Sequence, residues 1–219
     1  MTTDPSMIEY YAARAREYDR VYEKPERQSE LKILRTFLEN TFRNERVCEV
    51  ACGTGYWTQY VAKTATSIWA TDRTEATLEM AQTRKLGEHV RFDCQDAFNL
   101  PLPPQPCTAG LAAFIWSHIS KPDISRFLSS LHNALKPDSI VVCMDNVYVE
   151  GSSTPISRTD SIGNTYQIRQ LEDGSKHEVT KNFPTESELL TAVEGISTDA
   201  TVQCYKYYWT LTYRTSLSD

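Results

Sequence analysis

The residues best suited to binding a ligand lie in one short stretch, residues 47–58. An apolar segment there reaches Glu49, and two glycines, Gly53 and Gly55, follow one residue apart. Glycines directly after a buried strand let the backbone approach a ligand closely, because no Cβ intervenes. The next apolar segment ends at Asp72, whose carboxylate can accept hydrogen bonds from both hydroxyls of a ribose. The two segments together predict a nucleoside-binding site in an α/β fold.

The same stretch indicates which nucleoside is bound. A dinucleotide fingerprint requires a third glycine, but Thr58 occupies that position, after the bulky Tyr56 and Trp57. Glu49 also places negative charge near the position of a pyrophosphate. A cofactor with a cationic sulfonium and an amino group is more compatible with Glu49, which leaves a dinucleotide-dependent oxidoreductase as a poorer interpretation.

This pattern resembles motif I of the class I S-adenosylmethionine-dependent methyltransferases, with Ala51 in place of the usual first glycine. The run from Leu135 to Ser139 resembles the turn that precedes the fifth strand of that family. The resemblance implies that Asp96, after the third strand, binds the adenine amine. It implies S-adenosyl-L-methionine as the cofactor, bound by Glu49, Ala51, Gly53, Thr54, Gly55, Tyr56, Trp57, Asp72, Arg73, Asp96, Ala97, Phe98 and Phe114.

A tyrosine-rich leader precedes the glycine turn. Tyr11, Arg14 and Tyr18 fall on one face of a helix expected over residues 7–22. Similar leaders in small-molecule methyltransferases form a lid over the methionine end of the cofactor, so we add these three residues to the cofactor set. The alternative is an amphipathic helix that uses its tyrosines only for packing.

The chemical step is expected where the fourth strand ends. His118 there has a pKa suited to removing a proton from an acceptor hydroxyl, so it is a candidate base or acceptor-orienting residue, with a purely structural role as the alternative. We expect Trp116, His118, Tyr166 and Arg169 to contact a small polar or anionic acceptor. The last two belong to a segment whose Asp173–Gly174 pair predicts a β-hairpin. The rival roles of this hairpin are to extend the sheet or to form a dimer contact. No metal is expected, because no His, Cys and carboxylate residues show ligand spacing.

Composition excludes several other classes of protein. Lys and Arg number 23 against 29 Asp and Glu, a net charge of −6, which argues against nucleic-acid binding. No apolar run approaches the roughly 18 residues of a membrane span, and the N-terminus does not resemble a secretion signal. The six cysteines show no C-x-x-C pair, and most lie in apparent core strands, so reduced, buried thiols and a cytoplasmic location are expected.

Strand and helix patterns alternate from residue 46 onward. They predict an α/β, doubly wound, seven-stranded and mostly parallel sheet of the Rossmann-like methyltransferase type, within one domain spanning residues 1–219. The expected parts are a helical lid (1–45), a cofactor-binding core (46–148), a hairpin insertion after strand five (149–183), and a final helix with antiparallel strands (184–219).

Two functions from different classes follow from these features. The favoured one is methyl transfer from S-adenosylmethionine to an O or N atom of a small-molecule acceptor, by a monomer or homodimer. The alternative is a cofactor-binding module without transfer activity, such as a sensor or an inactive partner subunit.

Overall fold

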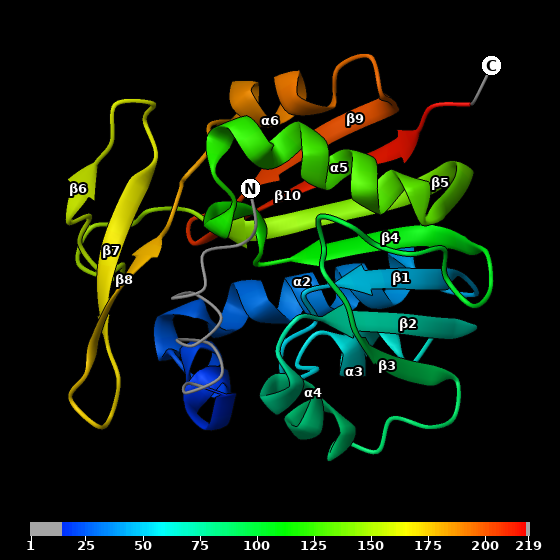
Figure 1. Ribbon diagram of the computed structural model, residues 1–219, viewed down its shortest axis with the longest axis horizontal. Coiled ribbons are helices and arrows are strands. Elements are labelled where there is room, and N and C mark those ends of the chain that lie inside the picture. The colour runs from blue at the N-terminus through cyan, green and yellow to red at the C-terminus, as the bar shows by residue number, and fades with distance from the viewer. Residues whose placement is uncertain (1–14, 218–219) are drawn as a thin grey trace.

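A seven-stranded sheet forms the centre of the protein in the computed structural model, which describes residues 15–217 and their side chains from residue 19 onward. Its order is β3-β2-β1-β4-β5-β10-β9, and β10 runs antiparallel to both of its neighbours. The other pairings are parallel. The strands are β1 (Arg46–Val50), β2 (Ser67–Asp72), β3 (Val90–Cys94), β4 (Cys107–Ala113), β5 (Leu135–Asn146), β9 (Ser197–Cys204) and β10 (Tyr208–Thr215). This is the predicted doubly wound, mostly parallel sheet (Figure 1).

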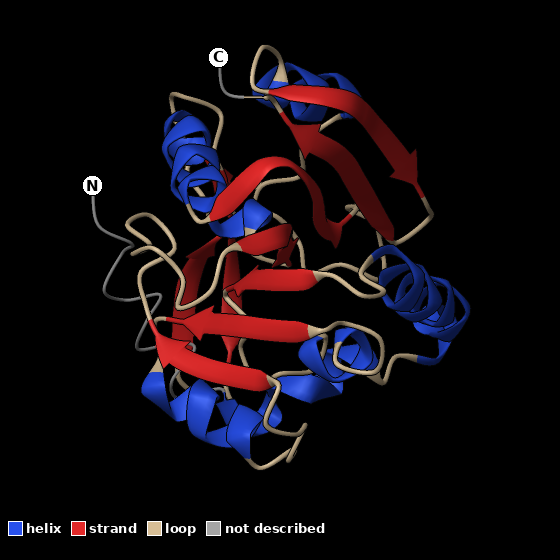
Figure 2. Ribbon diagram, turned by 90° about the vertical axis from the view of Figure 1, so that its right-hand side faces the viewer, coloured by secondary structure: helices blue, strands red, loops and turns tan. Residues whose placement is uncertain are grey.

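Helices cover both faces of this sheet (Figure 2). The α-helices are α2 (Gln28–Thr41), α3 (Thr58–Val61), α4 (Glu75–Gln82), α5 (Ile124–Asn133) and α6 (Glu186–Val193). One core packs α2 and α3 against Val47, Leu111 and Val142, and the other packs α5 and α6 against Cys48 and Cys143. Neighbouring residues of one strand thus point into different cores, which explains why β4 and residues 140–144 of β5 are apolar almost throughout.

Each covering helix is held by a short apolar stripe. Phe127, Leu128 and Leu131 of α5 are fully buried, at the i, i+1 and i+4 spacing that places side chains on one helical face. Burying each such side chain contributes roughly 1.5–3 kcal/mol. The helix α6 begins with the predicted capping box, in which Thr185 Oγ1 accepts from the Glu188 amide at 3.2 Å.

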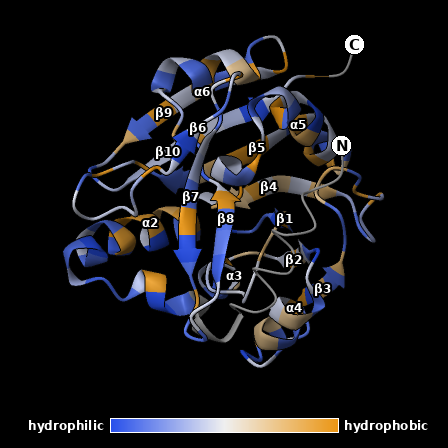
Figure 3. Ribbon diagram, turned by 60° about the vertical axis from the view of Figure 1, so that its left-hand side comes forward, coloured by the Kyte–Doolittle hydropathy of each residue, from blue (hydrophilic) through white to orange (hydrophobic). Residues whose placement is uncertain are grey.

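Two segments lie beyond the ends at which the parallel strands finish. The first is the leader, with the 3-10 helices η1 (Ala15–Tyr22) and η2 (Pro25–Arg27). The second is the insertion, a small sheet of β6 (Arg158–Thr159), β7 (Thr165–Gln170) and β8 (Lys176–Thr180). Figure 1 shows the insertion standing off the left-hand edge of the main sheet, with the blue leader below it. Figure 3 shows β7 as hydrophilic apart from one hydrophobic stretch. Ile168 is the hydrophobic residue of this strand, and it is half exposed.

Several expected details are wrong. Residues 135–139, expected as a turn, belong to β5, where a register shift lies between the Cys107–Leu135 and Ala109–Ile140 pairs. The helix α5 ends at Asn133, so Leu135 belongs to β5 and not to the apolar stripe of that helix. The cysteines are unpaired as expected, but Cys94 and Cys204 are exposed, because they lie in edge strands of the sheet.

Within residues 15–217, no helix has both the length and the apolar character that a membrane crossing requires.

Candidate cofactor and acceptor site

The two glycines of the turn after β1 serve different purposes. Both have a positive φ, +55° for Gly53 and +73° for Gly55, which side chains disfavour. A Cβ on Gly55 would lie 3.1 Å from the Cβ of Ala81, so this glycine permits the turn to pack against α4. A Cβ on Gly53 would meet nothing within 4 Å. Gly53 therefore borders open space, where a ligand can approach the backbone.

Two non-glycine residues near this turn also have positive φ, Ala51 at 52° and Phe114 at 62°. Ala51 occupies the position where the resemblance expects a glycine, so the local backbone keeps the glycine-like shape despite the substitution. Such conformations cost of order 1–3 kcal/mol each and gather at functional sites. Both residues follow carboxyl ends of central strands, β1 and β4.

Asp72 at the end of β2 organises the turn. Its Oδ2 accepts from the Gly53 amide at 2.9 Å, and its Oδ1 accepts from the Thr74 amide at 2.9 Å and from Thr77 Oγ1 at 3.1 Å. A carboxylate offers about four lone-pair positions, so capacity remains for a ribose hydroxyl. Burial raises the pKa of this carboxyl, and these donors partly offset the effect.

Glu49 is a buried carboxyl group without a partner. It is 1% exposed, and neither of its oxygens accepts a hydrogen bond from the described residues. Burial raises its pKa to about 8, and the neighbouring charge of Asp72 adds to the shift. Buried polar groups in native proteins nearly always have a partner. A cationic amino group placed here would satisfy Glu49, and S-adenosylmethionine carries such a group.

Asp96 follows β3 and lies next to Asp72 in the row of strand ends. Its Oδ2 forms an ion pair with Arg73 at 3.0 Å, and its Oδ1 accepts from the amide of Phe98 at 3.0 Å. The ring of Phe98 packs against Phe127, with ring centroids 6.0 Å apart. Ala97 lies between Asp96 and Phe98 in the sequence. The predicted cofactor residues from Glu49 to Asp96 are thus brought to the ends of three adjacent strands.

Aromatic side chains form a wall beside the glycine turn. Tyr22 stacks on Tyr56 at 3.7 Å between ring centroids and accepts a hydrogen bond from Trp57 Nε1 at 3.0 Å. Phe114 stacks on Trp57 at 5.6 Å and meets Tyr208 edge-on at 5.7 Å. The wall therefore joins the leader, the turn and the ends of β4 and β10.

The leader is also attached to the turn through Asp19. Its carboxylate accepts from Thr54 Oγ1 at 2.6 Å and pairs with Arg84, whose Nε donates to the Thr54 carbonyl at 2.6 Å. Sequence reasoning missed Asp19 and Arg84, since neither belongs to a motif. Tyr11 and Arg14 lie outside the described residues, as does the side chain of Tyr18, so the predicted lid contacts stay predictions.

A cavity of about 110 Å³ opens beside the aromatic wall, whose residues Tyr22, Phe114 and Tyr208 line it. Leader, strand ends, insertion and β10 all contribute to its lining, which comprises Val21, Tyr22, Lys24, Arg27, Phe114, His118, Asn146, Ser152, Ser153, Thr154, Gln167, Arg169, Val179, Lys181, Phe183 and Tyr208. Two of the four expected acceptor residues, His118 and Arg169, belong to it.

The other two expected acceptor residues lie elsewhere. Trp116 is 4% exposed and packs edge-on against Trp209 in the core beneath α5 and α6. Tyr166 donates to Asp160 at 3.0 Å, and the guanidinium of Arg158 lies 3.5 Å from the centre of its ring. Alternation along β7 explains the difference, because Arg169 is an odd number of residues from Tyr166 and points to the opposite face.

His118 is held as a neutral imidazole. Its Nδ1 lies 2.7 Å from the carbonyl oxygen of Thr180 and must donate, because a carbonyl can only accept. The Nε2 atom then carries the lone pair. Burial lowers the pKa of His118 to about 3, and the positive charge of Lys181 lowers it further than burial alone would.

A buried polar network lies next to His118. Lys181 Nζ donates to Asp145 Oδ1 at 3.0 Å and to Ser117 Oγ at 2.6 Å. Asp145 Oδ2 also accepts from the amide and the hydroxyl of Ser117. Sequence reasoning missed both charged residues. A usable signal existed for Asp145, which ends the apolar run of β5 as Asp72 ends that of β2.

No group of three or more His, Cys, Asp or Glu residues capable of holding a metal ion occurs among the described residues.

Comparisons with known proteins agree with this geometry. Residues 47–138 match the family model described as "Methyltransferase domain". No curated protein matches the chain in sequence. Among solved structures, one titled "DhpI-SAH complex structure" is 25% identical, with each chain covered to 96% and a TM-score of 0.78.

Two further structures share the fold. One titled "DhpI-SAM-HEP complex" is 24% identical over 95% of this chain and 96% of the other, with a TM-score of 0.79. A S-adenosylmethionine-dependent methyltransferase from Aquifex aeolicus is 19% identical over 93% and 98%, with a TM-score of 0.64. Residues 47–138 match a methyltransferase domain, and the sheet order and strand-end residues make this chain similar to the class I S-adenosylmethionine-dependent methyltransferases.

Proposed function

We propose that the chain transfers the methyl group of S-adenosylmethionine to an O or N atom of a small molecule bound in the cavity lined by His118 and Arg169. The observation that carries this proposal is the shared aromatic wall. Tyr22 and Phe114 line the cavity and also contact Tyr56 and Trp57 of the glycine turn. A cofactor on the turn and an acceptor in the cavity would therefore be neighbours, with these rings beside the line of transfer and not across it, as an in-line displacement requires.

The cofactor residues divide the work among them. Glu49 accepts from the amino group, Gly53 admits the cofactor to the backbone, Asp72 accepts from the ribose and Asp96 from the adenine amine. The bound cofactor supplies an electrophilic methyl group on a cationic sulfur. Aromatic faces favour a cation by roughly 0.5–2 kcal/mol per well-placed contact, and the wall offers such faces.

The acceptor residues mainly have to align the acceptor atom with the methyl group and the sulfur, because methyl transfer is an in-line displacement. His118 lines the cavity as a neutral imidazole, with Nε2 as its lone-pair nitrogen. That atom can orient an acceptor hydroxyl or amine by accepting its hydrogen bond. A related structure whose title names both SAM and HEP supports a fold with room for two ligands.

The direct test is a screen of small metabolites for formation of S-adenosylhomocysteine by the purified protein. Turnover of an acceptor is expected, with cofactor affinity measured separately by calorimetry. Asp72→Ala should lower that affinity about tenfold, or 1.4 kcal/mol, through lost ribose hydrogen bonds. Tight S-adenosylhomocysteine binding without any turnover would favour the alternative of a binding module, and tighter binding of a nicotinamide dinucleotide would overturn both.

A further inference from the structure

The cavity beside His118 is far more basic than the protein that contains it. Its charged lining residues are Lys24 and Arg27 from the leader, Arg169 from β7, and Lys181 after β8. No Asp or Glu is among the described residues that line it, although the chain as a whole carries a net charge of −6. These cations are contributed by segments far apart in sequence, so their convergence is a property of the fold.

The cations also lie close enough to affect one another. Burial lowers the pKa of Lys24, and the positive charges of Arg27 and, more weakly, Arg169 lower it further, against the opposing effect of Glu26. Like charges crowded at one place raise the free energy of the folded protein unless an anion joins them. The cavity thus has a positive potential suited to attracting an anion.

Arg27 is the residue whose charge most requires a partner. It is 7% exposed and forms no ion pair with a carboxylate of the described residues. Its Nη1 donates to Asn146 Oδ1 at 3.2 Å and its Nη2 to Ser152 Oγ at 3.1 Å, both neutral acceptors, while its buried Nε has no partner. The ring of Tyr207, 5.0 Å from the guanidinium carbon, provides only a cation–π contact.

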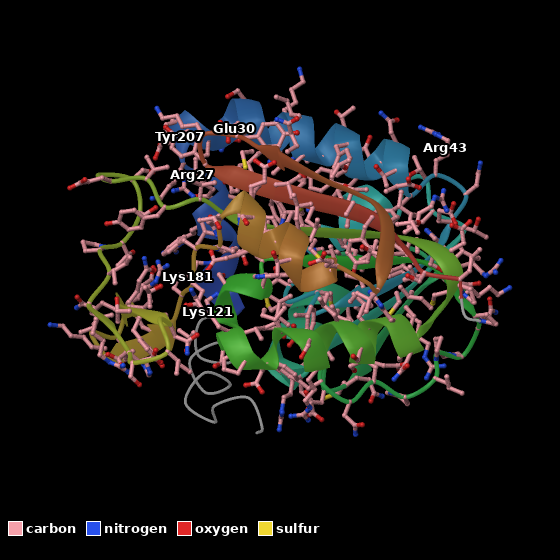
Figure 4. The ribbon with its side chains drawn as sticks, turned by 90° about the horizontal axis from the view of Figure 1, so that it is seen from above. Arg27, Glu30, Arg43, Lys121, Lys181 and Tyr207 are labelled. Atoms are coloured by element: carbon pink, nitrogen blue, oxygen red, sulfur yellow. The ribbon has the colours of Figure 1, made fainter. Side chains whose placement is uncertain are left out.

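Lys181 provides the contrast. It is equally buried, at 5% exposure, but Asp145 neutralises it at 3.0 Å. Figure 4 labels both cations; they belong to opposite sides of the cavity, Arg27 next to Tyr207 at the start of α2 and Lys181 by the insertion. A buried cation without a counter-ion is rare in proteins, whereas a paired one is common. The fold therefore keeps Arg27 desolvated at the wall of a cavity without a direct ion pair. The nearby carboxylate of Glu26 reaches it only through the Ser152 hydroxyl, which donates to Glu26 at 3.0 Å.

We propose that the cavity binds an oxyanion, a carboxylate, phosphate-type or sulfate-type group, through Arg27, and that this group belongs to the methyl acceptor. The planar guanidinium suits the paired oxygens of such a group. The volume of about 110 Å³ limits the acceptor to a small molecule. This inference rests on the proposed function for the identity of the ligand as the acceptor, but the anion site itself can be tested alone.

The experiment is calorimetric titration of three probe anions, inorganic phosphate, sulfate and acetate, into the protein saturated with S-adenosylhomocysteine at low ionic strength. At least one should bind saturably, and Arg27→Met should weaken it about tenfold, with Arg27→Lys weakening it less. Arg43→Met is the matched control, because this exposed arginine lies at the far end of α2 and away from the cavity (Figure 4). It should leave anion affinity unchanged.

Two outcomes would overturn the inference: no saturable binding of any probe, or equal weakening by Arg27→Met and Arg43→Met. The same titrations with S-adenosylhomocysteine alone keep the proposed function separate, since Arg27→Met should hold cofactor affinity within about twofold. If the original protein did not bind S-adenosylhomocysteine, that result would contradict the proposed function but not the anion site. Acceptors found by the screen should carry an oxyanion, and turnover of neutral molecules only would refute the link to the acceptor.

Discussion

The glycine turn and the cavity, which meet at the aromatic wall, present ionisable side chains of opposite kind, carboxyl groups at the turn and basic groups in the cavity. On the side of the glycine turn, the charged residues that face a ligand are the carboxylates Glu49 and Asp72, at the ends of β1 and β2. On the cavity side they are the cations Arg27, Arg169 and Lys181. The carboxylates belong to the sheet, whereas the cations belong to segments that pack over its edge. We therefore propose that cofactor binding is built into the central fold and acceptor binding into its attachments.

The buried pair on the cavity side offers the largest expected effect. Lys181→Met leaves Asp145 buried, 0% exposed and without its counter-ion, and should destabilise the fold by roughly 3–5 kcal/mol. The double variant Lys181→Met with Asp145→Asn removes both charges and should recover much of that loss. Urea unfolding of the three proteins measures this, and a double variant no more stable than Lys181→Met would contradict the pairing.

On the turn side, Glu49 makes stability depend on pH in a defined direction. Its carboxyl has a pKa of about 8 when folded, against 4.5 ordinarily, so the folded state retains a proton that the unfolded state loses. Stability is therefore fully present below pH 4.5 and declines as the pH rises toward 8. Glu49→Gln removes this decline, and its stability relative to the original protein should improve by roughly 2–4 kcal/mol between pH 5 and pH 8.

Denaturant unfolding at both pH values in the absence of ligand measures that difference. Glu39→Gln is a suitable control, because Glu39 lies on the surface of α2 and pairs with Lys63. A constant difference between Glu49→Gln and the original protein across this range would mean that Glu49 ionises freely in the fold.

The two glycines of the turn separate packing from ligand access. Gly55→Ala forces a Cβ to within 3.1 Å of Ala81 and should cost about 1–3 kcal/mol of stability. Gly53→Ala meets no neighbour and should cost only about 1 kcal/mol for its positive φ, yet lower S-adenosylhomocysteine affinity about tenfold. Thermal unfolding and calorimetry on both variants measure these differences. A Gly53→Ala variant that binds S-adenosylhomocysteine as tightly as the original protein would show that Gly53 does not belong to the site.

His118 gives an effect that is confined to acidic pH and absent at neutral pH. Its pKa is lowered to about 3 in the fold, so the unfolded state binds a proton first as the pH falls. Its contribution to stability is complete above pH 6.5 and is lost toward pH 3, at about 1 kcal/mol per pH unit. His118→Gln should flatten the stability profile between pH 6.5 and pH 4. His132, whose pKa burial lowers to about 4, leaves a residual slope in both proteins.

The sequence was sufficient to predict the sheet and to place the expected cofactor residues at strand ends, for a physical reason. Glu49, Gly53, Asp72 and Asp96 are fixed to strand ends, and parallel strands align their ends whatever surrounds them. The turn expected at residues 135–139 was wrong because a bulge in β5 absorbs Pro137 and Asp138. The apolar spacing typical of α5 also continues to Leu135, although the helix ends at Asn133 and Leu135 already belongs to β5.

The cavity side was predicted only in part. His118 follows β4 directly, so its place at the strand ends was accessible from sequence. Arg27 and Lys181 meet at the cavity only because the leader and the insertion fold over the same edge, and no local pattern encodes that meeting. Trp116 looked like an acceptor residue by proximity to His118, but the 3-10 turn η3 (Trp116–His118) directs it into the core.

Calorimetric titration of S-adenosylhomocysteine into Glu49→Gln and Arg27→Met tests the division of charge most directly. This ligand carries the amino group that Glu49 is expected to bind but no sulfonium, so it isolates the turn side. Glu49→Gln should lose about tenfold or more in affinity, as expected for a hydrogen bond between charged groups. Arg27→Met should stay within about twofold of the original protein. Unchanged affinity in Glu49→Gln, or an equal loss in Arg27→Met, would contradict the account.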